Sequence, residues 1–275
     1  MSPDARALLA VARKELRVLR RYPLTLLNTM LFMPLYQLVL PVLLLGTAFL
    51  VKGRSLGMDE LTGTSDFGGW LSAGLVGATV TGTVLSGPAQ AMASERGLGT
   101  LEQTWAMPVS RRALVLGLMT CMTGLSLLAG VTMAVLVSLV AGASYGPGTV
   151  LVLPVFAALV PGLAGMGLLS ASLSLLWRQA VGLTDNLGYV VTVLAGVTFP
   201  VAVLWDALRP VSYLIPTTWA IDLSRRAALG ADSLYPPAVE VCALLATSGL
   251  FLAGGTALFG RMERRMRAEG ALGQH

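Results

Sequence analysis

The sequence predicts an all-α membrane protein, and three observations support this fold class. Hydrophobic residues make up 55% of the 275 residues and charged residues only 12%. A mean hydropathy of +0.75 would make a soluble domain of this size aggregate, so a lipid bilayer is the expected solvent. Uncharged runs of about 20 residues, the length that one helix needs to cross a bilayer, recur along the chain. We expect a single transmembrane domain over residues 1–275, with no nucleotide-binding domain.

The first element is predicted over residues 4–21, where basic and hydrophobic residues are interleaved. This pattern is typical of an amphipathic helix that lies at the membrane interface. Its charged residues include Arg13, Lys14, Glu15 and Arg17. We expect their side chains to contact membrane lipid, and Pro23 to turn the chain into the bilayer.

Six crossings are predicted, at about 24–49, 69–92, 113–141, 150–176, 187–204 and 239–259. The third and fourth lie in a stretch without charged residues, which a glycine-rich hairpin at 142–148 divides. In the second run, small residues recur at every fourth position and so share one helical face: Gly74, Ala78, Gly82 and Ser86. Such a face is compatible with close helix packing, and also with a transport pathway or a dimer contact.

The basic residues predict which side of the membrane each loop faces. With a cytoplasmic N-terminus, 14 of the 19 Lys and Arg residues fall on the cytoplasmic side of the six crossings. An excess of basic residues in cytoplasmic loops is the general rule, and five or seven crossings would spoil the division. Only two of the basic residues are lysines, which indicates a GC-rich bacterial genome. We therefore expect a bacterial plasma membrane, with both termini in the cytoplasm.

Several functions are disfavoured by what the predicted crossings lack. Proton-coupled transport and intramembrane catalysis need ionisable groups inside the bilayer, and the runs contain almost none, with Glu240 at an edge. Cys121 and Cys242 belong to no ligand cluster, so we expect no metal site. The basic residues lie between apolar runs and not on one soluble face, which disfavours nucleic acid as a partner.

Nucleotide binding is disfavoured as well. A phosphate-binding loop of the form G-x-x-x-x-G-K-[ST] needs a lysine, and neither Lys14 nor Lys52 stands in such a motif. The chain is therefore expected not to be an enzyme. If ATP drives it, a separate chain would hydrolyse the ATP.

The loop between the second and third runs carries a resemblance to a known family. It contains a Glu-Arg pair at 95–96, the sequence Gly-Thr-Leu-Glu at 99–102, Pro108 and an Arg-Arg pair at 111–112. This order resembles the cytoplasmic loop of ABC type-2 transporter permeases, the group that contains the daunorubicin-resistance-type exporters. Residues 196–200 and 208–220 resemble the short extracellular re-entrant helices that this family has between spans five and six.

The resemblance implies a permease subunit of an ATP-driven exporter. The partners would be an ABC ATPase subunit, which would bind the ATP and Mg, and a second copy of the chain or a related permease. The interfacial helix would also contact the ATPase. The residues implied in coupling to the ATPase are Glu95, Arg96, Gly99, Thr100, Leu101, Glu102, Pro108 and Arg111.

An extracellular gate is expected in the re-entrant region, from Phe199, Pro200, Pro216 and Trp219. The charged residues nearby are expected to form a solvated cap, with a part in the gate as the alternative: Asp206, Asp222, Arg225, Arg226 and Asp232. The uncharged runs favour a hydrophobic or amphipathic cargo, such as an antibiotic, a drug or a lipid-like compound. The alternative function is a scaffold or immunity protein that binds such a compound, or a partner, without transporting it.

Overall fold

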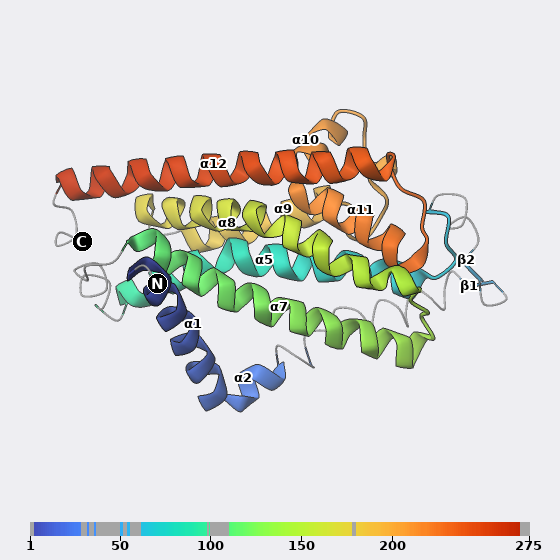
Figure 1. The fold of residues 1–275 in the computed structure, drawn as a ribbon, viewed down its shortest axis with the longest axis horizontal. Coiled ribbons are helices and arrows are strands. Elements are labelled where there is room, and N and C mark those ends of the chain that lie inside the picture. The colour runs from blue at the N-terminus through green and yellow to red at the C-terminus, as the bar shows by residue number, and fades with distance from the viewer. Residues whose placement is uncertain are drawn as a thin grey trace.

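The computed structural model describes residues 3–28, 32, 36, 50–51, 54–55, 62–97, 99, 110–177 and 180–269. Long helices run side by side in an elongated bundle (Figure 1). Most of the first predicted crossing, 24–49, lies outside the described residues. A two-residue antiparallel pair joins β1 (Leu50–Val51) to β2 (Arg54–Ser55), with Leu50 opposite Ser55.

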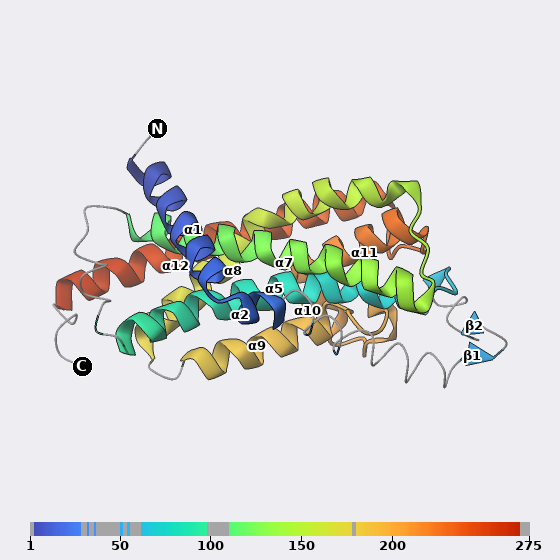
Figure 2. The ribbon, with the colours of Figure 1, turned by 90° about the horizontal axis from the view of Figure 1, so that it is seen from below.

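The predicted N-terminal helix is present as α1 (Pro3–Arg21), and it ends where the sequence places a proline. Pro23 begins the short helix α2 (Pro23–Leu27), a position in which its missing N–H costs nothing. Helix α1 crosses α7 (Arg111–Ala141) obliquely (Figure 2). The crossing is close, because a Cβ atom at Gly117 of α7 would lie 2.8 Å from the carbonyl oxygen of Leu8.

Four helices in the described part of the chain are long and apolar enough to cross a membrane. They are α5 (Phe67–Gly97), α7, α8 (Val152–Leu176, preceded by the 3₁₀ helix η3, Pro147–Leu151) and α12 (Pro237–Glu269). Helix α9 (Ala180–Leu194) is apolar but shorter. The chain is thus a helical, multi-pass membrane protein, and the count of six crossings stays a prediction.

The helix of the fifth run differs from the predicted range of 187–204, because it begins at Ala180 and ends at Leu194. Gly196 has a φ of +71°, which favours glycine, and it turns the chain out of the helix. The 3₁₀ helix η4 (Val201–Val203) follows Pro200. Two short helices then occupy the region of the expected re-entrant helices: α10 (Arg209–Leu214) and α11 (Pro216–Leu229).

Local capping signals explain where the long helices begin and end. The Asp66 carboxylate accepts a hydrogen bond from the Gly69 N–H at 2.8 Å, and the Ser110 hydroxyl accepts one from the Ala113 N–H at 3.3 Å. Both side chains satisfy amide groups that have no partner within the first helical turn. Helix α7 ends at Gly142, which has a φ of +67°.

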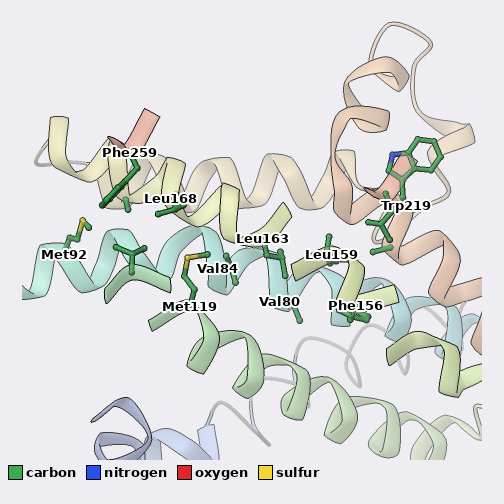
Figure 3. Close-up of a cluster of buried hydrophobic side chains, with 14 of the residues drawn as sticks. Val80, Val84, Met92, Met119, Phe156, Leu159, Leu163, Leu168, Trp219 and Phe259 are labelled. Atoms are coloured by element: carbon green, nitrogen blue, oxygen red, sulfur yellow. The ribbon is translucent and has the colours of Figure 1, made fainter. Parts of the chain in front are cut away.

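The main core lies between α5, α7, α8, α11 and α12 (Figure 3). Val80 and Val84 of α5 are fully buried, and so are Leu159 and Leu168 of α8. The backbones of α8 and α12 approach closely at Gly165, because a Cβ atom there would overlap the carbonyl oxygen of Phe251. Small residues at such contacts are the usual means by which membrane helices pack tightly.

The bundle has two ends, which we name after one residue at each. At the Arg96 end, α5, α8 and α12 finish and α7 begins; at the Arg225 end lie α10 and α11 (Figure 1). Helix α1 also begins toward the Arg96 end. Candidate functional residues from the sequence lie at both ends.

Candidate coupling and gate sites

Arg96 attaches the end of α5 to the end of α8. Its Nη2 atom donates a hydrogen bond to the Ser174 carbonyl oxygen at 3.0 Å. Ser174 lies in the last turn of α8, where carbonyl groups have no partner within the helix. The positive charge also suits the negative ends of both helix dipoles. Arg96, predicted as a coupling residue, thus already binds a second helix of its own chain.

Glu95 lies beside α1, so the predicted coupling loop and the predicted interfacial helix meet. The charges of Lys14 and Glu15 both act on its carboxyl group. Lys14 and Glu15 form an ion pair at 3.1 Å, with side-chain exposures of 63% and 16%. Arg13 and Arg17 of the same helix are exposed to the surroundings.

Arg111, at the other side of the loop, contacts α12. Its Nη1 atom lies 3.5 Å from Oε1 of Glu263, and the two side chains are only 10% and 15% exposed. Near the start of the loop, Gly99 has a φ of +68° and its N–H donates to the Arg96 carbonyl at 3.2 Å, which makes a tight turn. The remaining predicted coupling residues lie outside the described part: Thr100, Leu101, Glu102 and Pro108.

The face of small residues on α5 is divided between two environments. Gly74 is buried, and a Cβ atom there would overlap the Val197 carbonyl oxygen and approach the Arg225 guanidinium. Ala78 packs against a second hydrophobic cluster, whereas a Cβ atom at Gly82 would contact nothing within 4 Å. Ser86 is partly buried. Gly74 is therefore packed against other segments of its own chain, and the pathway or dimer face stays a prediction.

Arg225 corrects the expectation of a solvated cap, because it is only 4% exposed. Its guanidinium donates to three backbone carbonyl oxygens: Trp70 at 3.2 Å, Gly196 at 2.8 Å and Val197 at 2.6 Å. It also lies 3.4 Å from the centroid of the Trp70 ring, a cation–π contact. One side chain thus joins α11, the start of α5 and the turn that follows α9.

The buried guanidinium is surrounded by polar groups of the protein. A buried charge is tolerated only where polar groups replace water, and the three carbonyl oxygens do so here. The burial of Arg225 could have been predicted from the sequence. Ile221 and Ala228, at i−4 and i+3, place residue 225 on the apolar face of α11.

The predicted gate residues lie in two segments at the Arg225 end. Pro216 and Trp219 are buried at the start of α11, whereas Phe199 and Pro200 are partly buried in the turn after α9. The Trp219 indole donates to the Tyr213 carbonyl at 2.9 Å, and the two rings stack with centroids 5.4 Å apart. A moving gate formed by these residues stays a prediction.

Two carboxyl groups meet where α11 contacts the start of α12. Glu240 is fully buried, so an ionisable group lies inside the protein where the sequence indicated only an edge position. Its Oε1 atom accepts from the Tyr235 N–H at 3.0 Å, and Asp222 accepts from the Leu234 N–H at 2.9 Å. The neighbouring amides of one turn therefore hold both carboxyl groups.

Three other charged residues of the expected cap face the surroundings, whereas Asp222 is partly buried. Asp206 is 84% exposed in its side chain and pairs with Arg209 at 2.9 Å. Arg226 and Asp232 are also exposed, and Arg226 donates to the Ser233 hydroxyl. A solvated surface is therefore found around Arg225, though Arg225 itself is not part of it.

Comparison with known families gives one match that covers most of the chain. The sequence model described as ABC-2 type transporter matches residues 6–229. The matched segment begins in α1 and extends to the end of α11, so it includes both ends of the bundle. No curated protein sequence matches the chain.

Proposed function

Because the chain belongs to the ABC-2 type transporter family, it is a membrane permease subunit of an ABC transporter, and we propose that it exports a hydrophobic or amphipathic compound. The energy comes from a separate ATPase subunit, to which ATP and Mg²⁺ bind. Two permeases, either two copies of this chain or one copy with a related chain, enclose the pathway. In this proposal the chain crosses a bacterial plasma membrane six times, with the Arg96 end at the cytoplasm and the Arg225 end outside.

The observation that carries this proposal is the convergence of the predicted coupling elements at one end of the bundle. The loop 98–109 begins at the end of α5 and finishes at the start of α7, and Glu95 lies beside α1. The residues that flank the loop and the N-terminal helix therefore lie at the same end of the bundle. An ATPase that closes on ATP beneath this end can displace the loop and the N-terminal helix together. ATP binding would then favour one of two conformations of the permease over the other.

The character of the helix surfaces supports a hydrophobic or amphipathic cargo. Aliphatic side chains are exposed along α7, among them Val131, Val135 and Leu139, and along α8, among them Leu153 and Val160. Between Ala113 and Trp177 the sequence has no charged residue. A surface of this kind suits lipid chains or a second permease, and it offers no fixed charge to select a strongly anionic glycan.

The experiment that tests the proposal is purification of the chain from gently solubilised native membranes, with the natural residue or Arg at position 102. We expect an ATPase chain to co-purify, and the membrane complex to hydrolyse ATP. Glu102→Arg should release the ATPase or reduce ATP hydrolysis by about tenfold, a typical size for coupling between sites. Asp206→Arg, an equal charge reversal at the opposite end, should leave co-purification unchanged.

The outcome also distinguishes the exporter from the alternative function, a scaffold or immunity protein. If no ATPase accompanies the natural chain, the exporter proposal is wrong, and a scaffold or immunity protein that binds a lipid-like compound replaces it. If the ATPase accompanies the chain and Glu102→Arg has no effect, the result supports the exporter proposal but contradicts a coupling role for residue 102.

A further inference from the structure

One oxygen atom of the buried Glu240 carboxyl group has no hydrogen-bond donor. Glu240 stands in the first turn of α12, where an acidic side chain is common, but it is 0% exposed. Its Oε1 atom accepts a hydrogen bond from the Tyr235 N–H at 3.0 Å. Its Oε2 atom is buried as well, and no residue that the structure describes donates to it. A buried carboxylate oxygen without a donor is costly, so this atom needs an explanation.

A second carboxyl group lies beside Glu240. Asp222 of α11 is within hydrogen-bonding reach of it. Oδ2 of Asp222 accepts from the Leu234 N–H at 2.9 Å, and the next amide along the chain, that of Tyr235, donates to Glu240. Consecutive amides thus hold the two carboxyl groups together where α11 meets α12. Two ionised carboxylates in contact repel each other strongly, and pairs of this kind usually share one proton.

No cationic side chain of the described residues pairs with this buried carboxyl group. The charge of Arg226 on α11 acts on it, but the Arg226 side chain is exposed and donates to the Ser233 hydroxyl. Arg225 donates to three backbone carbonyl groups. Tyr213 of α10 and Tyr235 pack ring to ring, with centroids 5.9 Å apart, and tyrosine is ordinarily neutral at pH 7. Helix α8, which packs along α12, has no charged or titratable side chain.

We propose that Glu240 and Asp222 form a proton-binding site that joins α12 to α11. A proton on Oε2 of Glu240 is donated to the Asp222 carboxylate, so the unpartnered oxygen becomes a donor and the repulsion is removed. When the proton leaves to solvent, two negative charges remain in contact and the junction is weakened. The site lies at the Arg225 end, so in the proposed topology it responds to the pH outside the cell. The proton-binding site itself does not depend on the proposed export function.

A divalent metal ion is another occupant that two carboxylates can hold, but the surroundings favour the proton. Ca²⁺ and Mg²⁺ need about six or more oxygen ligands. The described part of the chain has no group of three or more Asp, Glu, Cys or His side chains that could hold a metal ion. The amides of Leu234 and Tyr235 also occupy carboxylate oxygens that a metal ion would need. A proton needs only one oxygen atom of each carboxyl group.

The test measures unfolding of the full-length permease in detergent by denaturant titration, from pH about 6 to about 9. Glu240→Gln is the central variant, because glutamine still accepts from the Tyr235 N–H and can donate to Asp222 without binding a proton. Asp206→Asn, at an exposed carboxylate, is the matched control. All chains carry His275→Gln, which removes the only histidine, the residue type that ordinarily titrates in this range.

The direction of the pH dependence follows from the number of bound protons. In the unfolded chain both carboxyl groups are ionised above about pH 5, whereas the folded chain keeps one proton. The folded state therefore binds more protons, and its stability falls as the pH rises. With the natural pair, the unfolding equilibrium constant should rise by about tenfold per pH unit, the limit for one proton, until the site loses its proton. Asp206→Asn should keep this dependence, and Glu240→Gln should lose it.

Infrared spectroscopy detects the proton directly and needs no unfolding. At neutral pH, the carbonyl stretch of a protonated carboxyl group should appear in the chain with the natural pair and in Asp206→Asn. Glu240→Gln should remove that band.

Three results would overturn the inference. The first is a pH dependence in Glu240→Gln equal to that of the natural pair, and the second is the absence of a protonated-carboxyl band at neutral pH. The third is a stability at neutral pH that a chelator lowers and Ca²⁺ or Mg²⁺ restores only when Glu240 is present, which would assign the site to a metal ion.

Discussion

The Arg225 end and the Arg96 end of the bundle are both held by arginines, but in different ways. Arg225 is 4% exposed and fully surrounded by backbone carbonyl groups and the Trp70 ring. At the Arg96 end, the ion pair of Lys14 with Glu15 is partly exposed, with Lys14 at 63% side-chain exposure. Removing one partner from a buried charge is costly, whereas exposed pairs contribute little. The Arg225 contacts are therefore costly to break, whereas the contact of Lys14 at the Arg96 end can rearrange at low cost.

The largest effect is expected from Arg225→Met, which keeps much of the side-chain volume and removes the charge. The buried carbonyl oxygens of Gly196 and Val197, which lie outside any helix, would lose their donor at roughly 1–3 kcal/mol each, so the free energy of unfolding should fall by at least about 2 kcal/mol. Unfolding of the purified permease in detergent measures this change. Arg226→Met, on the exposed neighbour, should change stability by less than about 0.5 kcal/mol. Equal effects from the two variants would contradict the fixed Arg225 end.

A smaller effect is expected from Gly74→Ala, where one methyl group would enter the space beside Val197 and Arg225. Forcing an atom into a packed core costs about 1–3 kcal/mol. Gly82→Ala, two turns further along the same helix, is the matched control, because nothing lies within 4 Å of its new Cβ atom. There alanine should stabilise the helix by up to about 1 kcal/mol. The sign of the change thus distinguishes the two halves of the small-residue face, and two changes of the same sign would refute that division.

The smallest effect is expected at the Arg96 end from Lys14→Gln. The Lys14 side chain is 63% exposed, so the free energy of unfolding should change by less than about 0.5 kcal/mol. Added salt should barely alter the result, since little electrostatic stabilisation is present to be screened. A loss as large as that of Arg225→Met would show that both ends are equally fixed.

Much of the helical architecture could be predicted from the sequence. The length of the apolar runs matches the thickness of a bilayer, and capping residues mark the ends of helices. The runs 69–92, 113–141 and 150–176 each contain a long helix, and Gly142 ends one where the glycine-rich hairpin was expected. The helix over 180–194 was misplaced because residues 195–204 are as apolar as a helix interior. Hydropathy alone cannot distinguish a buried turn from a crossing, and the conformation of Gly196 decides the boundary.

The candidate site was predicted less completely than the fold. Sequence order identified the loop and α1 but gave no indication that Arg111 meets Glu263, residues separated by 152 positions. The prediction for Arg225 was wrong: the sequence analysis put this arginine in a solvated cap, as is usual for arginines, whereas its side chain is buried. Contacts between distant segments depend on how helices pack, which a single sequence does not reveal.

The short length of α9 has a consequence for the membrane around it. Fifteen residues of helix extend about 22 Å, less than the roughly 30 Å of the hydrocarbon layer. If α9 is the fifth crossing of the proposed topology, part of the hydrocarbon layer is spanned by the irregular chain after Leu194. Backbone of this kind is tolerated in lipid only where protein groups satisfy it. The Arg225 guanidinium donates hydrogen bonds to the Gly196 and Val197 carbonyls, so a single side chain takes the place of water at this turn.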